Sequence, residues 1–191
     1  MKYDTEFAQF DSNYNSNGYG FARGIDLFWR DSKTLKNIDY GVSYSFLDTK
    51  RDYLNYPSKA QPNFANTHNL SIVGKYWIND WRSQVGFSYA FASGRTYTNP
   101  NTAGFLNEKT KAYNSLSINW AYLISPQKIL YASVNNVLGF KNINGYQYAN
   151  TANGNGVFES RALQPAADQF FFVGFFWTIS EDKKSNQLDK L

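Results

Sequence analysis

His68 is the only histidine in the chain, and it stands where a long polar segment meets an alternating one. Hydrolases combine a histidine with Ser, Asp or Asn side chains, and Asn66, Asn69 and Ser71 lie nearby in the sequence. A hydrolase also needs an oxyanion hole and a positioned nucleophile, and no motif in the chain marks either. We therefore predict that the chain is not an enzyme and that His68 is an ordinary strand-end residue.

Two polar segments carry residue types that bind polar ligands. They are SGRTYTNPN (93–101) and NINGYQYANTANGN (142–155). A tyrosine ring stacks on a ligand and an amide hydrogen-bonds its hydroxyl groups. The candidate ligand contacts are Arg95, Tyr97, Asn99, Tyr146 and Tyr148; the alternative is that both segments are plain exposed loops. No metal-ligand spacing or phosphate-binding loop is present, so we expect no cofactor.

The elements that position these residues alternate with a period of two. In WRSQVGFSYAFA (81–92), large apolar residues alternate with Gln, Gly, Ser and Ala. The same pattern predicts strands at 20–31, 38–48, 68–78, 81–92, 112–123, 128–138 and 169–180, with a weaker first strand at 2–11. These strands are about ten residues long, whereas soluble strands average about five or six.

The predicted connections alternate in length. Short links lie at 32–37, 79–80 and 125–127, and long links lie at 49–67, 93–111 and 139–168. Short turns at one rim and long loops at the other are typical of outer-membrane barrels.

The less apolar face of the predicted strands decides which side meets lipid. It carries mostly Gly, Ser, Ala, Asn and Gln, which would be a poorly hydrated exterior for a soluble barrel but suits an enclosed lumen. The aromatics expected at the membrane interface are Trp29, Trp77, Trp81, Tyr122 and Trp177. Asp26 and Arg30 share the lumen side about 13 Å apart, at about 3.3 Å per residue, and should pair with neighbouring strands. A soluble barrel or sandwich with the apolar face inward is the alternative.

The pattern thus predicts an all-β fold, an antiparallel up-and-down transmembrane β-barrel of about eight strands. Residues 1–180 would form the barrel segment and 181–191 a polar tail. The longest apolar run, 170–177, is too short for a membrane helix of about 18 residues.

The composition excludes several classes of protein. Aromatic residues make up 19% of the chain, too many for a disordered one. The absence of cysteine excludes disulfides and thiolate metal sites. The net charge of +4 is scattered through turns, so we expect no nucleic-acid partner.

Six segments together resemble the C-terminal barrel of TonB-dependent outer-membrane receptors of the Bacteroidetes type. They are GYGFARGIDLFWRD (18–31), IDYGVSYSFLDTKRDY (38–53), NFANTHNLSIVGKYWI (63–78), FSYAFASGRTYTNP (87–100), YASVNNVLGFKNINGYQY (131–148) and FFFVGFFWTIS (170–180). The resemblance spans most of 18–180.

The resemblance implies a location in the outer membrane of a Gram-negative bacterium and a part in taking up a siderophore, vitamin or glycan. Such receptors are large barrels with an internal plug, and a 22-stranded barrel needs more than this chain's 191 residues. We therefore expect the C-terminal segment of a larger receptor barrel, without the plug. The alternative is a free-standing eight-stranded barrel with a structural or adhesion role.

The resemblance also implies partners. They are outer-membrane lipid, the barrel-assembly machinery, the missing N-terminal plug and barrel, and an unidentified small-molecule or glycan ligand. The last strand of such barrels is read by the assembly machinery, a role that falls here on Phe171, Phe175 and Trp177.

Overall fold

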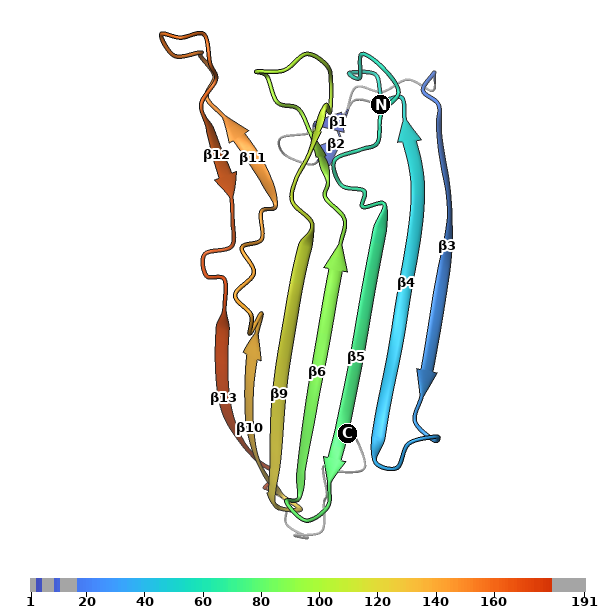
Figure 1. The fold of residues 1–191 in the computed structure, drawn as a ribbon, viewed down its shortest axis with the longest axis vertical. Helices are drawn as coiled ribbons and strands as arrows, with labels where there is room; N and C mark the ends of the chain where they lie inside the picture. Colours follow the sequence, from blue (N-terminus) through green and yellow to red (C-terminus); the bar gives the residue numbers. More distant parts are fainter. Residues whose placement is uncertain (1–2, 5–8, 11–16, 180–191) are drawn as a thin grey trace.

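The chain folds into one long antiparallel sheet with short hairpins at one end (Figure 1). We analysed a computed structural model, which describes residues 3–4, 9–10 and 17–179. The described residues form strands, turns and bends and no helix, so none of them forms a helix able to cross a membrane. The polar tail expected at 181–191 lies outside the described residues.

Seven strands make up the sheet, and each is hydrogen-bonded to its neighbours in the chain order. They are β3 (Gly20–Asp31), β4 (Ile38–Arg51), β5 (His68–Ile78), β6 (Ser83–Ala92), β9 (Tyr113–Ser125), β10 (Lys128–Asn135) and β13 (Phe170–Trp177). The order is β13-β10-β9-β6-β5-β4-β3, with every pair antiparallel. The prediction of an all-β, antiparallel, up-and-down sheet is confirmed.

Three further pairs of short strands lie outside this sheet. They are β1 (Tyr3–Asp4) with β2 (Gln9–Phe10), β7 (Thr96–Tyr97) with β8 (Glu108–Lys109), and β11 (Gly145–Tyr148) with β12 (Ser160–Leu163). The predicted first strand at 2–11 is wrong, because residues 3–4 pair with residues 9–10 and one extended strand cannot pair with itself. The other two hairpins lie within segments that we predicted as loops.

The register aligns large apolar residues of neighbouring strands on one face of the sheet, and in the middle strands nearly all of them lie there. One row runs Tyr40–Gly74–Phe87–Ile118–Val134–Phe171, and residues opposite one another in a sheet share a face. The ring of Phe87 lies over Gly74, where a Cβ would come within 2.5 Å of the ring. We call this side the apolar face.

The opposite side, which we call the small-residue face, is formed by the four middle strands β4, β5, β6 and β9. It carries Ser43, Ser45, Asn69, Ser71, Gly86, Ser88, Ala90, Ala92, Ser115, Ser117 and Asn119. In these four strands the apolar and the small or polar side chains therefore lie on opposite faces, as the alternation in the sequence predicted.

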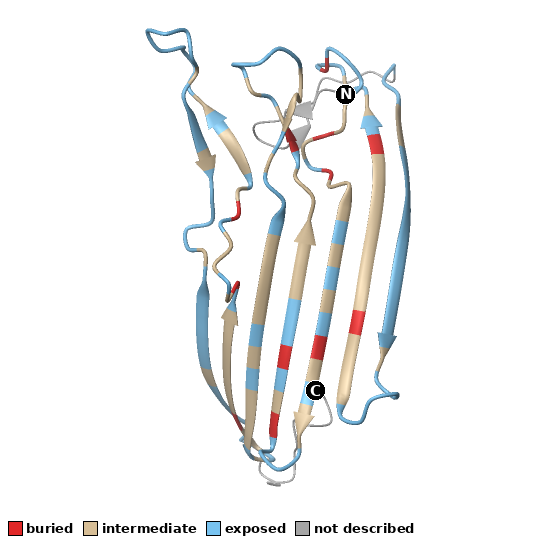
Figure 2. Cartoon of the chain, viewed as in Figure 1, coloured by how far each residue is buried: buried red, intermediate tan, exposed pale blue. Residues whose placement is uncertain are grey.

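No second layer covers either face within the described residues (Figure 2). Leu27, Ile118 and Phe175 remain 59%, 40% and 56% exposed. The buried hydrophobic residues of the described chain are Tyr56, Ala65 and Ile129, and the first two lie in a connection. The sheet thus has no core of the kind that two packed layers enclose.

A charged pair marks one limit of the apolar face. On β4 this face runs from Ile38 to Phe46, about 26 Å at about 3.3 Å per residue. The next residue on that side, Asp48, forms an ion pair of 2.8 Å with Arg23 on β3. The apolar stretch therefore matches the height of the lipid-facing band of about 25 Å in membrane barrels.

On the small-residue face, the charges pair between strands. Arg30 on β3 binds Asp39 on β4 with two hydrogen bonds, and the amine of Lys75 on β5 lies 3.8 Å from the same carboxylate. The prediction that Arg30 pairs with a neighbouring strand is confirmed. Asp26 faces Ser45 across the β3–β4 pair and forms no ion pair among the described residues.

The sheet is not closed within the described residues. Each of β3 and β13 pairs on one side only, and they do not pair with each other. The barrel of about eight strands is thus not formed by these seven strands alone.

Asn136 ends β10 three residues earlier than we predicted. Its φ of +50° turns the chain out of the strand. Its buried side-chain amide donates to the carbonyl oxygens of Phe140 and Asp168 and accepts from the N–H of Phe140, at 2.7–3.1 Å. This one side chain therefore joins the end of β10 to the residues that lead into β13.

We predict that Asn136→Ala lowers the free energy of unfolding by about 2 kcal/mol or more. The change leaves half-buried carbonyl and N–H groups of Phe140 and Asp168 without the Asn136 partner and puts alanine at a strained positive φ. Asn136→Gly also removes the side-chain amide, but glycine adopts a positive φ without strain. It should therefore lower the free energy of unfolding less than Asn136→Ala does. Urea titration measures all variants, with the exposed Asn150→Ala as control. Equal stability of Asn136→Ala and Asn150→Ala would contradict this role.

Candidate functional site

The candidate site lies at the end of the sheet where the long connections gather (Figure 1). The connections after β4, β6 and β10 all lie at this rim, and they are bound to one another. The hydroxyl of Thr96 donates to the carbonyl of Gln61, and the side chain of Asn101 exchanges two hydrogen bonds with the backbone of Phe158. The three connections are therefore held together by hydrogen bonds and do not form independent loops.

Four of the five predicted ligand contacts come together in one cluster. The ring of Tyr97 lies 4.8 Å from the ring of Tyr146 and 6.5 Å from that of Tyr148. The Tyr97 hydroxyl donates to the carboxylate of Glu108, which also accepts from the side chain of Asn99 at 2.8 Å. We call Tyr97, Asn99, Glu108, Tyr146 and Tyr148 the tyrosine cluster.

Glu108 is the member of this cluster that the sequence did not reveal. It reaches Tyr97 because β7 and β8 pair and place the two residues opposite each other. These strands are two residues long, too short to show alternation. The spacing Tyr146-Gln147-Tyr148 was a usable signal, since residues two apart on a strand share a side.

The tyrosine cluster has a settled protonation state. The hydrogen bond from Tyr97, followed by that from Asn99, lowers the pKa of Glu108. Burial first, and then the bond to Glu108, raises the pKa of Tyr97 above its ordinary value. Burial also raises the pKa of Tyr148. At neutral pH Tyr97 and Tyr148 are therefore neutral phenols and Glu108 is an ionised carboxylate that accepts from Tyr97 and Asn99, an arrangement that suits stacking and hydrogen bonding rather than proton transfer.

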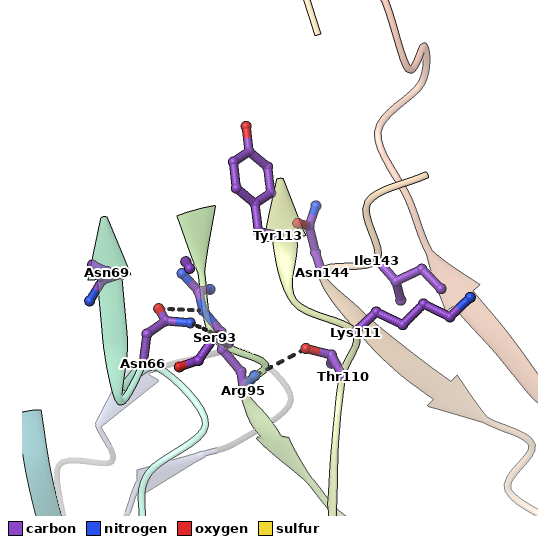
Figure 3. A pocket seen from close by; sticks show the side chains of 10 residues that line it. Asn66, Asn69, Ser93, Arg95, Thr110, Lys111, Tyr113, Ile143 and Asn144 are labelled. Carbon is purple, nitrogen blue, oxygen red and sulfur yellow. Dashed lines mark hydrogen bonds between the residues drawn. The ribbon is translucent and has the colours of Figure 1, made fainter. Parts of the chain in front are cut away.

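Arg95 stands apart from the tyrosine cluster and lines a cavity of about 260 Å³ at the upper end of the small-residue face (Figure 3). Its Nε donates to Oδ1 of Asn66 at 3.2 Å, and its backbone N–H donates to the hydroxyl of Thr110 at 3.0 Å. Lys111, Tyr113 and Asn144 line the same cavity. We call this cavity the rim pocket.

Ser93 fixes one wall of the rim pocket. Its hydroxyl accepts from the backbone N–H groups of Thr67 and His68 at 2.9 and 3.0 Å, and its own N–H donates to the carbonyl of His68. The side chain of Asn66 donates to the carbonyl of Ser93. The segments before β5 and after β6 are thus held together beneath Arg95.

The histidine and serine considered for hydrolysis do not meet. His68 lies on the apolar face opposite Phe46, and its Nδ1 lies 2.9 Å from the hydroxyl of Tyr44. Ser71 and Asn69 lie on the small-residue face. In the described part of the chain, no three His, Cys, Asp or Glu residues are grouped as metal ligands.

All five predicted interface aromatics lie in or beside the short turns, with cations against two of them. Trp29 packs edge-on against Tyr40 with ring centres 5.0 Å apart, and Trp81 is exposed in the turn between β5 and β6. The amine of Lys128 lies 4.8 Å from the ring of Trp177. The guanidinium carbon of Arg82 lies 5.9 Å from the ring of Tyr122.

Trp77 lies on the other side of the sheet. It faces Gln84 on the small-residue face, while Tyr76 and Ile78 occupy the apolar face. Its indole N–H donates to the side chain of Asn79 at 2.9 Å. Its place near a strand end led to the prediction of a membrane-interface position. The alternation of β5 puts its side chain on the face opposite Tyr76 and Ile78.

The predicted assembly residues Phe171, Phe175 and Trp177 share the apolar face of β13. The opposite face of this strand is also aromatic, which we did not predict. Phe172 and Phe176 lie 6.0 and 6.4 Å from the ring of Tyr131 on β10. The small-residue face therefore ends before β13.

No family model matches this chain, and no curated protein matches it.

We predict that Tyr97 makes the stability of the protein fall above pH 10. Its folded pKa is raised above the ordinary value of 10.0, so the stabilisation is complete below that pH and is lost as the pH rises toward the folded pKa. Tyr97→Phe should flatten the loss, and Glu108→Gln should flatten it in part. Urea unfolding between pH 8 and 11 measures the slopes, with Glu159→Gln as the charge-matched control. Parallel slopes for wild type and Tyr97→Phe would contradict the assignment.

Proposed function

We propose that this chain is a segment of an outer-membrane β-barrel that takes up a nutrient, similar to the C-terminal barrel of TonB-dependent receptors. The observation that carries the proposal is the uncovered apolar face. Large side chains are aligned across seven strands, and the described residues provide no second layer for them.

The free-energy balance favours lipid against this face. Each exposed Leu, Ile or Phe side chain loses about 1.5–3 kcal/mol of stabilisation relative to burial. A soluble barrel or sandwich would bury the face against a second sheet or its own interior. Acyl chains provide the same apolar surroundings without a second layer, and the backbone groups of β4 to β10 are already paired on both sides.

The two open edges favour a segment over a complete small barrel. An unpaired backbone amide in hydrocarbon costs several kcal/mol, so β3 and β13 need further strands beside them. The sheet of the described residues also has an odd number of strands, seven, whereas single-chain bacterial barrels have even numbers. Strands of a larger barrel would pair both edges.

The two rims support the same orientation. Trp, Tyr and cationic side chains at the short turns fit a membrane interface, where amphipathic rings lie at headgroup depth. The tyrosine cluster and the rim pocket lie at the opposite, long-loop rim, where a ligand arriving from outside meets the barrel first. We assign nutrient binding to these residues and outer-membrane assembly to β13.

We predict that lipid contacts Ile118 and not its neighbour Ser117. Ile118 lies on the apolar face of β9 and Ser117 on the small-residue face. The chain has no cysteine, so Ile118→Cys and Ser117→Cys each give one labelling site. A fluorophore at position 118 should be quenched by spin-labelled acyl chains after folding into liposomes, and one at 117 should not. Quenching at 117 alone, or stable folding in water without any amphiphile, would refute the proposal.

We predict that β3 and β13 do not join within one chain. Cysteine pairs that scan Leu27 against Phe171, Val173 and Phe175 test this, because a disulfide requires Cβ atoms about 4 Å apart. The control pair, Val134→Cys with Phe171→Cys, joins strands that are hydrogen-bonded in the sheet. The control should cross-link within the chain, and the scanned pairs should not. Efficient intrachain cross-linking of a scanned pair would favour the free-standing small barrel.

A further inference from the structure

We propose that the rim pocket binds the oxyanion of a small polyhydroxylated molecule, with the class of sugar phosphates and sugar acids as its ligands. This inference specifies the ligand class of the proposed function. It rests on the proposed function in one respect, that the long-loop rim faces the outside from which the ligand arrives. The chemistry comes from the pocket's own residues.

The charge of the rim pocket has one sign. Arg95 and Lys111 both line it, and no carboxylate does. Neither cation belongs to any of the four ion pairs of the described residues. The nearest acidic residue in the sequence, Glu108, accepts hydrogen bonds from Tyr97 and Asn99 in the tyrosine cluster. An anion is the ligand that neutralises this site.

Arg95 is already oriented for that role. Asn66 accepts the hydrogen bond of its Nε, and Thr110 accepts that of its backbone N–H. The terminal amino groups of the guanidinium form no hydrogen bond or ion pair with the described residues and can form the paired hydrogen bonds that carboxylates and phosphates prefer. Figure 3 shows Arg95 beside Asn66 and Ser93, with Lys111 extending toward Ile143 on the other side of the pocket.

A second hollow of about 280 Å³ continues from the rim pocket along the small-residue face. The two share Asn69, Ala92 and Tyr113. The continuation carries no charge, and Ser43, Ser45 and Ser71 line it together with the apolar residues Leu70, Ala90 and Phe91. A ligand with its oxyanion at Arg95 would therefore rest its neutral body on a mainly apolar surface with a few hydroxyl and amide groups, as the carbon face and hydroxyls of a sugar ring require.

Size and composition narrow the ligand class. Pockets for drug-sized ligands measure about 300–1,000 Å³, so the rim pocket suits one small ring and its charged group. The exposed ring of Tyr113 offers a stacking surface, and the serine and asparagine side chains both donate and accept. An apolar anion would leave these polar groups without partners, which disfavours it.

Calorimetric titration of the full chain folded in detergent tests the proposal. The probes are glucose 6-phosphate, glucuronate and glucose. They carry a phosphate, a carboxylate and no charge, so their affinities show which oxyanion the pocket prefers. At least one anionic probe should bind about tenfold or more tightly than glucose, since a charge-assisted hydrogen bond contributes about 1.5–3 kcal/mol.

Matched variants assign the effect to the rim pocket. Arg95→Gln should weaken the anionic probe about tenfold or more, and Arg95→Lys should weaken it less because the charge remains. Lys111→Gln should also weaken it, whereas Lys109→Gln makes the same charge change outside the pocket and should not. Glucose binding should respond little to any of them.

Three outcomes would overturn the inference: no binding of either anionic probe, equal affinity for glucose, or equal losses in Lys109→Gln and Arg95→Gln. Acyl-chain quenching at position 118, measured on the same samples, separates this failure from failure of the proposed function. Quenching without anion binding refutes the pocket's role alone, and anion binding without quenching refutes the membrane barrel alone.

Discussion

A sheet of one layer has no interior of its own, and this constraint governs the rest of the molecule. Hydrogen bonds between neighbouring strands satisfy the backbone of the inner strands, but the side chains gain burial only from what lies against them. The register puts nearly every large apolar side chain of the middle strands on one side. The surroundings of that side therefore decide whether the fold is stable, and an apolar solvent supplies what a second sheet supplies in a soluble protein.

The long-loop rim also lacks an apolar core, and polar groups stabilise it instead. Asparagine amides take the place of a core there, because each can donate and accept at once. Asn142 exchanges two hydrogen bonds with the backbone of Asn114, and Asn136 ties the end of β10 to the start of β13. Such pairs hold irregular backbone in place where no apolar layer is available. The abundance of asparagine in these connections is thus structural, and only part of it is left for binding a ligand.

The sequence predicted the sheet well and the rim poorly, for a physical reason. A period of two over ten residues identifies a strand and its faces, so β3, β5 and β9 lie within two residues of their predicted limits. The pairing of Tyr97 with Glu108 depends on two-residue strands, which have no period to detect. Trp77 was assigned to the interface by its place near a strand end, although its position in the alternation puts it on the small-residue face. The open edges at β3 and β13 depend on which strands pair across the whole sheet, and the local alternation of residues carries no information on that pairing.

The change in character across the small-residue face connects the fold with the proposed site. The four middle strands carry serine, alanine, glycine and asparagine there, whereas Phe28 on β3 and Phe172 and Phe176 on β13 make the same side aromatic toward both edges. A polar molecule bound on this face would therefore meet the small side chains of the middle strands rather than the aromatic rings of the edges. The rim pocket lies at the long-loop end of that strip, and its cations precede an uncharged floor. In the proposed function, this order would attract an anion first and then offer its neutral body a surface of small side chains, which leave room that the edge aromatics would fill.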